Sequence, residues 1–142
     1  MMTPSNILIE ALKAFEGFRP KAYRCPAGVW TIGYGHTGGV RSGQLITREE
    51  ADRVLRADAA KAAAAVTELG VVKTQGQLDA LTDFVFNLGA AALRSSTLLR
   101  VIRANADERC VRREFMRWVY AGGRPLQGLA KRRAWEADRF FS

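Results

Sequence analysis

The sequence predicts an α+β fold that is mainly helical, with one small antiparallel sheet near the N-terminus. Most of the chain carries apolar residues at helical spacing between capping and terminating residues. One stretch, residues 22–46, instead shows short β-type runs between glycines. At 142 residues the chain is long enough for one domain with a proper core. We therefore expect a single domain over 1–142, ordered as helix, small sheet, long helix and helical cluster.

The first helix is predicted over residues 5–16. Ser5 or Asn6 can cap it, and Gly17 can end it. Its apolar stripe comprises Ile7, Leu8, Ala11, Leu12 and Phe15. Glu16 falls in the last turn beside this stripe, where partial desolvation of a carboxyl group disfavours its charged form. The end of this helix is therefore a candidate position for acid chemistry.

The small sheet is predicted from two short runs, 22–25 and 29–32, with Pro26 and Gly28 suited to the turn between them. Such a sheet is not stable alone, so it must pack against helices.

The later helices are predicted from their caps. Thr47 and Glu50 form a capping box that opens a long helix ending near Leu69, and Thr74 with Gln77 repeats that pattern. Further helices are expected from Thr74 to Gly89, from Ser95 or Ser96 through Ile102, over 108–120 after the cap Asp107, and over 128–140 after the Gly122–Gly123 turn.

The charge is +8 and is concentrated in residues 94–142, which hold 12 basic and 5 acidic side chains. A basic face indicates a polyanionic partner, such as nucleic acid, an anionic membrane surface or an anionic cell-wall polymer. The chain has no helix-turn-helix spacing or RNA-binding motif, so no specific nucleic acid is expected.

No run of about 18 uncharged apolar residues occurs, so no membrane-spanning helix is predicted. The N-terminal stretch is a poor signal peptide because Glu10 interrupts its apolar residues.

The two cysteines, Cys25 and Cys110, are too few for a zinc cluster with the single His36. We expect two free thiols, with Cys110 buried and inert among helical residues.

Three side chains in the stretch 15–36 suit glycosidic bond cleavage. That reaction needs an acid for the leaving oxygen and a second group that activates water or attacks the anomeric carbon. Glu16 suits the acid role, Cys25 stands where a second group is needed, and the Thr31 hydroxyl could orient the water. One Glu, one Cys and one Thr are a weak signal when taken alone.

The pattern Glu16–x8–Cys25–x5–Thr31, followed by Ile-Gly-Tyr-Gly-His36, resembles the catalytic stretch of the phage-type lysozymes of glycoside hydrolase family 24. The resemblance continues through ITREEA, ALTDFVFNLGAAALRSSTLL, FMRWVYAGG and GLAKRR, in order along nearly the whole chain. It implies hydrolysis of the β-1,4 bond between N-acetylmuramic acid and N-acetylglucosamine in peptidoglycan, without a cofactor or a metal. It also implies a two-lobed fold around a cleft, with a sheet lobe at 17–46, a connecting helix at 47–69, and a helical lobe at 74–142 packed with helix 5–16.

The resemblance also implies roles for further residues. It places sugar contacts at Thr37, Phe86 and Thr97, with Arg112 as a fourth candidate; core packing is the alternative for Phe86. It makes His36 a structural residue paired with Asp58, so we assign His36 no catalytic role.

Cys25 departs from the Asp that is commoner at this position, although Cys also occurs in the family. A thiol would need a lowered pKa to serve as base or nucleophile, and Arg19, Lys21 and Arg24 could supply positive charge. As a base it would give inversion, and as a nucleophile a covalent intermediate and retention. We favour inversion by water held between Cys25 and Thr31. The alternative is a small residue that only fills a turn.

Two other functions stay open at this point. A lytic transglycosylase also uses a Glu acid but gives anhydro ends, and a non-catalytic wall-binding or nucleic-acid-binding helical module would need no acid. For a phage lysozyme we expect a monomer made in the host cytoplasm, which reaches the wall in the periplasm after the membrane is permeabilised.

Overall fold

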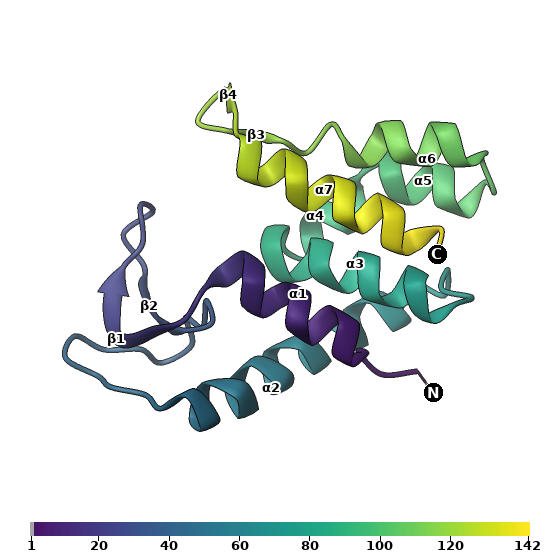
Figure 1. Cartoon of the computed structure of the whole chain (residues 1–142). Coiled ribbons are helices and arrows are strands. Elements are labelled where there is room, and N and C mark those ends of the chain that lie inside the picture. The colour runs from purple at the N-terminus through teal and green to yellow at the C-terminus, as the bar shows by residue number, and fades with distance from the viewer. Residues whose placement is uncertain (1) are drawn as a thin grey trace. The chain divides into compact units, whose positions relative to one another are not determined.

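A computed structural model describes residues 2–142 (Figure 1). The chain divides into two compact units, residues 6–61 and residues 62–142 with the segment 2–5. Both units are dominated by helices, and short antiparallel strand pairs complete them. The predicted architecture, α+β and mainly helical, is confirmed. No helix within residues 2–142 is long and apolar enough to cross a membrane.

The 6–61 unit contains α1 (Asn6–Glu16), β1 (Arg19–Arg24), β2 (Trp30–Gly33) and most of α2 (Arg48–Thr67). The strands pair antiparallel, with Tyr23 opposite Thr31 and Arg24 opposite Trp30. Strand β1 begins three residues before the predicted run. The buried face of α1 also differs from the predicted apolar stripe, because Ile9 is buried whereas Ile7, which was predicted to belong to the stripe, is 56% exposed.

Helix α1 is joined to α2 by an ion pair, in which Lys13 Nζ lies 2.6 Å from Asp52 Oδ1. Asp52 also accepts a hydrogen bond from Arg56 Nε at 2.8 Å. Both contacts lie within the 6–61 unit. The packing of this helix with residues 74–142 stays a prediction.

The capping predictions are confirmed in detail. The Glu50 N–H donates to Thr47 Oγ1 at 3.1 Å, and the Thr47 N–H donates to Glu50 Oε1 at 3.2 Å, which completes the capping box. Thr74 accepts from the Gln77 N–H at 3.1 Å. The Gln77 side chain, however, accepts from the Lys73 N–H at 2.8 Å rather than from Thr74.

The 62–142 unit contains the remaining elements. These are α3 (Gln75–Leu88), α4 (Ala90–Ser95), α5 (Thr97–Arg103), α6 (Glu108–Phe115), β3 (Tyr120–Ala121), β4 (Arg124–Pro125) and α7 (Gln127–Phe140). Ser96 caps α5 and Asp107 caps α6, as predicted. Helix α7 packs along α3 (Figure 1), and the core between the helices includes Phe84, Phe115 and Phe140.

Two predictions for this unit were wrong. The short helix α4 was missed, and α6 ends at Phe115 instead of continuing to residue 120. The chain turns back at Gly122 and Gly123, which have φ angles of 58° and 77°. The Leu126 N–H donates to the Val119 carbonyl at 2.9 Å, so a β3–β4 hairpin replaces the predicted end of the helix.

Buried ion pairs fasten α7 to α3. Arg132 donates two hydrogen bonds of 3.0 Å to the fully buried Asp83. Arg133, also fully buried, lies 2.8 Å from Glu136 Oε1 through Nε and donates to Asn87 Oδ1 at 2.7 Å. Arg132 and Asp83 join α7 to α3, whereas Arg133 and Glu136 both lie on α7 and reach α3 through Asn87. Because a buried charge is stable only beside its partner, these contacts fix how the two helices pack.

Candidate active site

Glu16 is the last residue of α1, and its half-buried side chain packs against the turn after β2. A Cβ atom on Gly35 would lie 3.0 Å from Glu16 Cδ and would overlap Glu16 Oε1. Gly35 has a φ angle of 76°, and the turn is closed by two 2.9 Å backbone hydrogen bonds between Ile32 and His36. Only glycine therefore lets this backbone approach the carboxyl group.

Cys25 lies at the tip of the β1–β2 hairpin. Its N–H donates to the Val29 carbonyl at 2.9 Å, and the Gly28 N–H donates to the Cys25 carbonyl at 2.7 Å, which closes the turn. The thiol is free and half-buried. Thr31 is 5% exposed, and its hydroxyl donates to the Val29 carbonyl at 3.1 Å.

The pKa of the Cys25 thiol is lowered from its ordinary value. The main cause is the Val29 backbone N–H, which donates to sulfur; the Ala27 N–H and the Thr31 hydroxyl act in the same sense, and partial burial opposes them. Because a hydroxyl has one proton, Thr31 bonds either to the thiolate or to the Val29 carbonyl.

The cause of this shift differs from the predicted one. Basic side chains were candidates for lowering the pKa of Cys25, but the Arg19 guanidinium lies 4.1 Å from the centroid of the Tyr23 ring. The Arg24 guanidinium likewise lies 5.6 Å from the centroid of Trp30. Hydrogen bonds from the turn and from Thr31 provide the stabilisation instead.

We expect Cys25 to react with iodoacetamide at a lower pH than an ordinary thiol, because only the thiolate attacks and its fraction rises as pH passes the lowered pKa. The alkylation rate should be measured against pH in a Cys110→Ser background. Thr31→Val removes one donor and should move the midpoint to higher pH. A midpoint at or above that of a free cysteine peptide would contradict the lowered pKa.

His36 and Asp58 are in contact, with Nδ1 2.7 Å from Asp58 Oδ2. The other ring nitrogen, Nε2, lies 2.9 Å from the Gly38 carbonyl oxygen. The Asp58 contact joins the loop after β2 to α2, and the Gly38 contact holds the ring within the loop. A purely structural role for His36 stays a prediction.

The predicted sugar contacts are distributed over both units. Thr37 is exposed in the 6–61 unit. In the 62–142 unit, Phe86 packs partly buried against the core, which agrees with the alternative that it is a core residue.

Thr97 lines a hollow of about 270 Å³ with Glu114, Arg117 and Trp118. Arg112 does not line this hollow.

Arg112 is already engaged within its own unit. Its Nε lies 2.8 Å from Glu108 Oε2, and its Nη1 lies 2.7 Å from Asp138 Oδ1. A sugar contact by this side chain would have to share donors with those carboxylates.

Sequence reasoning missed two features of this site. The close approach of Gly35 to Glu16 and the hydrogen bonding of the Val29 N–H to Cys25 were not predicted. The available signal was the Gly-x-Gly-His pattern directly after a strand, which marks a backbone that must approach something closely.

Residues 13–136 match the family described as Phage lysozyme. The chain belongs to the phage lysozyme family. This phage lysozyme is 45% identical over 136 residues to an endolysin of Acyrthosiphon pisum secondary endosymbiont phage 1, and the match covers 92% of each chain. It is 40% identical to the endolysin of Bacillus phage B103, of whose length it spans 55%.

Solved structures agree with this assignment. The muramidase domain of SpmX from Asticaccaulis excentricus superposes with a TM-score of 0.90 at 35% identity, over 100% of this chain and 99% of that one. An endolysin from Escherichia coli O157:H7 phage FAHEc1 gives a TM-score of 0.83 at 33% identity, over 99% and 94%. The predicted lysozyme-like fold and the predicted enzyme class, a lysozyme that hydrolyses peptidoglycan, are confirmed.

Proposed function

We propose that Glu16, Cys25 and Thr31 carry out the hydrolysis of the β-1,4 bond between N-acetylmuramic acid and N-acetylglucosamine. Glu16 donates its proton to the leaving 4-oxygen of N-acetylglucosamine. Water attacks C1 of N-acetylmuramic acid and gives its proton to the Cys25 thiolate, while Thr31 orients that water. This single displacement inverts the configuration at C1.

The observation that carries this assignment is the environment of Cys25. A lowered pKa gives the thiol a larger thiolate fraction, as a base requires. The buried Thr31 hydroxyl donates to the Val29 carbonyl at 3.1 Å, and in this orientation its oxygen can accept a hydrogen bond from the attacking water. Glu16, held against Gly35, supplies the acid.

The products of peptidoglycan digestion test this mechanism. We expect new reducing ends of N-acetylmuramic acid that carry the elements of water, with the α-anomer formed first, as mass spectrometry and early-time proton NMR would record. Anhydro ends, lighter by one water, would instead identify a lytic transglycosylase. An initial β-anomer would contradict the inverting role of Cys25.

We expect Gly35→Ala to lower the rate of wall hydrolysis about 100-fold, because the new methyl group displaces the Glu16 carboxyl group from its position. The rate of clearing of a cell-wall suspension measures this effect. Gly39→Ala is the matched control, since Gly39 has a φ angle of 70° but no atom within 4 Å of the added Cβ. Equal losses in both variants would mean that backbone strain alone explains the effect.

Thr37, Phe86, Thr97 and Arg112 are retained as proposed contacts to the sugar chain. Thr97 has the best local support because its half-buried hydroxyl borders a hollow that also offers a carboxylate, a guanidinium and an indole ring. Phe86 is half-buried at the edge of the core, so its remaining exposed surface would be the part that meets a sugar.

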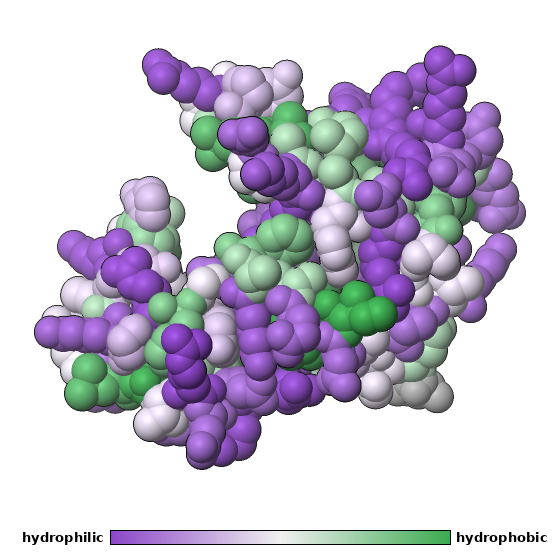
Figure 2. Space-filling model, viewed as in Figure 1, coloured by the Kyte–Doolittle hydropathy of each residue, from purple (hydrophilic) through white to green (hydrophobic). Residues whose placement is uncertain are grey.

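Phage endolysins act on the cell wall, and we propose a monomer made in the host cytoplasm that reaches the wall after the membrane is permeabilised. Exposed arginines on α5 and α6 would attract it to the anionic envelope; these are Arg100, Arg103, Arg109 and Arg113. Figure 2 shows that hydrophilic side chains cover this part of the surface.

We expect clearing of cell walls to slow steeply as NaCl is added, because salt screens attraction between exposed charges. The double variant Arg109→Gln, Arg113→Gln should show a shallower dependence on salt. Hydrolysis of short uncharged sugar substrates should not change in either protein. An unchanged salt slope in the double variant would remove these two side chains from the interaction.

A further inference from the structure

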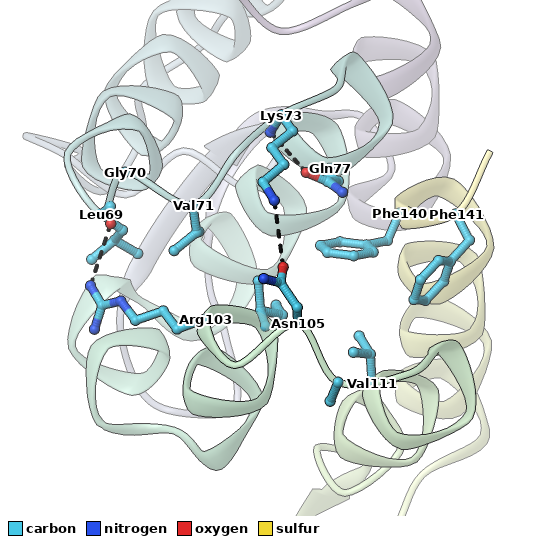
Figure 3. Close-up of a pocket in the computed structure, with 12 residues that line it drawn as sticks. Leu69, Gly70, Val71, Lys73, Gln77, Arg103, Asn105, Val111, Phe140 and Phe141 are labelled. Carbon is cyan, nitrogen blue, oxygen red and sulfur yellow. Dashed lines mark hydrogen bonds between the residues drawn. The ribbon is translucent and has the colours of Figure 1, made fainter.

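A pocket of about 340 Å³ lies in the 62–142 unit, and none of the proposed catalytic residues or sugar contacts lines it (Figure 3). It is bordered by the α2–α3 loop, the start of α3, the end of α5 with the α5–α6 loop, α6, and the C-terminal end of α7. Its size falls within the range of small-molecule sites. Hydrolysis of peptidoglycan does not account for it.

The floor of the pocket is apolar and belongs to the edge of the core. Val111 and Phe140 are buried, and Phe141 packs on Phe140 with ring centroids 4.9 Å apart. In Figure 3 these three side chains gather on one side of the pocket. Val111 and Phe140 are 2% and 6% exposed, so Phe141, together with the half-buried Leu69 and Val71, adds most of the apolar surface open to an alkyl body.

The rim of the pocket is basic. None of the residues that line it is acidic, whereas Lys73 and Arg103 are both basic and exposed. Lys73 Nζ lies 3.4 Å from Asn105 Oδ1, and Arg103 Nη2 lies 3.4 Å from the Leu69 carbonyl. Both distances exceed the usual range for N–H···O bonds, and both acceptors are neutral. A carboxylate would be a stronger partner for either cation.

Asn105 is held beside Lys73 by its own backbone. Its φ angle of 53° is the one positive value among the described residues other than glycine. The N–H groups of Asn105 and Ala106 donate to Ile102 and Val101 at 3.1 and 3.0 Å, which fixes the turn. Figure 3 shows Lys73 and Asn105 reaching toward each other across the pocket.

We propose that this pocket binds a medium-chain aliphatic carboxylate, the chemistry of a free fatty acid. Its carboxylate replaces Asn105 as the partner of Lys73, and its alkyl chain lies on Val111, Phe140 and Phe141. The anionic head matches the basic rim, and the chain covers the apolar floor. This site is independent of the hydrolytic mechanism.

Titration of the full chain with hexanoate, followed by amide NMR shifts, tests the site. We expect saturable shifts at Val111, Phe140 and Phe141 in the millimolar range. Hexanamide, which has the same chain without the charge, should bind about tenfold more weakly. Absence of saturable shifts, shifts confined to other residues, or equal binding of the amide would overturn the proposal.

Two variants locate the head group. Lys73→Met should weaken hexanoate about tenfold, whereas Lys131→Met, which removes an exposed lysine of α7 outside the pocket, should leave it unchanged. Asn105→Gly suits the positive φ and removes the competing acceptor, so it should bind hexanoate at least as tightly as the wild type. Equal effects of the two lysine variants, or weaker binding by Asn105→Gly, would overturn this placement.

Discussion

Glu16→Gln is expected to abolish the clearing of cell walls while leaving the fold intact. A glutamine amide cannot supply the proton that the leaving sugar oxygen needs, and loss of a general acid costs about 10²–10⁴-fold in rate. The side chain is half-buried at the end of α1, and the substitution preserves its shape, so the melting temperature should hardly change. Clearing rate and thermal unfolding are the two measurements.

The matched control is Glu10→Gln on the same helix. Glu10 is 73% exposed and lies 3.7 Å from Lys13, so its loss should affect neither rate nor stability appreciably. Retention of more than about a tenth of the activity by Glu16→Gln would assign the acid role to another group. A large fall in melting temperature would instead indicate that Glu16 mainly holds the turn at Gly35 in place.

Four helix starts could be predicted because capping is local. A side-chain oxygen that accepts from an N–H three residues later needs nothing beyond its own turn, and Thr47, Thr74, Ser96 and Asp107 all do so. The end of α6 is different. Residues 116–120 carry helical spacing, but pairing of Val119 with Leu126 requires a turn whose course depends on the rest of the chain.

The site shows the same division between local and tertiary information. Glu16 could be placed at a helix end beside apolar residues from the sequence alone. Its contact with Gly35 joins two segments that are distant along the chain, so periodicity cannot reveal it. Basic side chains were candidates for lowering the pKa of Cys25, but Arg19 and Arg24 lie over aromatic rings. The pKa is lowered mainly by hydrogen bonds from backbone N–H groups instead. Every residue type except proline has such a group, so the sequence does not mark it.

The basic C-terminal third illustrates what composition cannot distinguish. Its arginines were all candidates for an exposed face. Arg132 and Arg133 are instead buried in ion pairs, and Arg139 donates to the buried Asp79 at 2.8 and 3.0 Å. Part of the positive charge therefore serves to hold α7 against α3, and only the exposed remainder is available to an anionic partner.

Arg132→Met is expected to destabilise the protein by about 3–5 kcal/mol, because it leaves the Asp83 carboxylate buried without its bidentate partner. A protein of this size should then lose roughly 10 °C in melting temperature. Chemical denaturation followed by circular dichroism measures the free energy of unfolding. Lys131→Met, one residue earlier on α7 and exposed, should change it by less than about 0.5 kcal/mol.

The double variant Asp83→Leu, Arg132→Met distinguishes the two ways in which this pair could act. If the cost of the single variant comes from an unpartnered buried charge, removing both charges should restore most of the lost stability, because an apolar pair of similar volume fills the same space. If the double variant is as unstable as Arg132→Met, the hydrogen bonds themselves must hold α7 on α3. A loss below about 1 kcal/mol in the single variant would show that Asp83 finds another partner; Arg133 and Glu136 already interact with it in the same cluster.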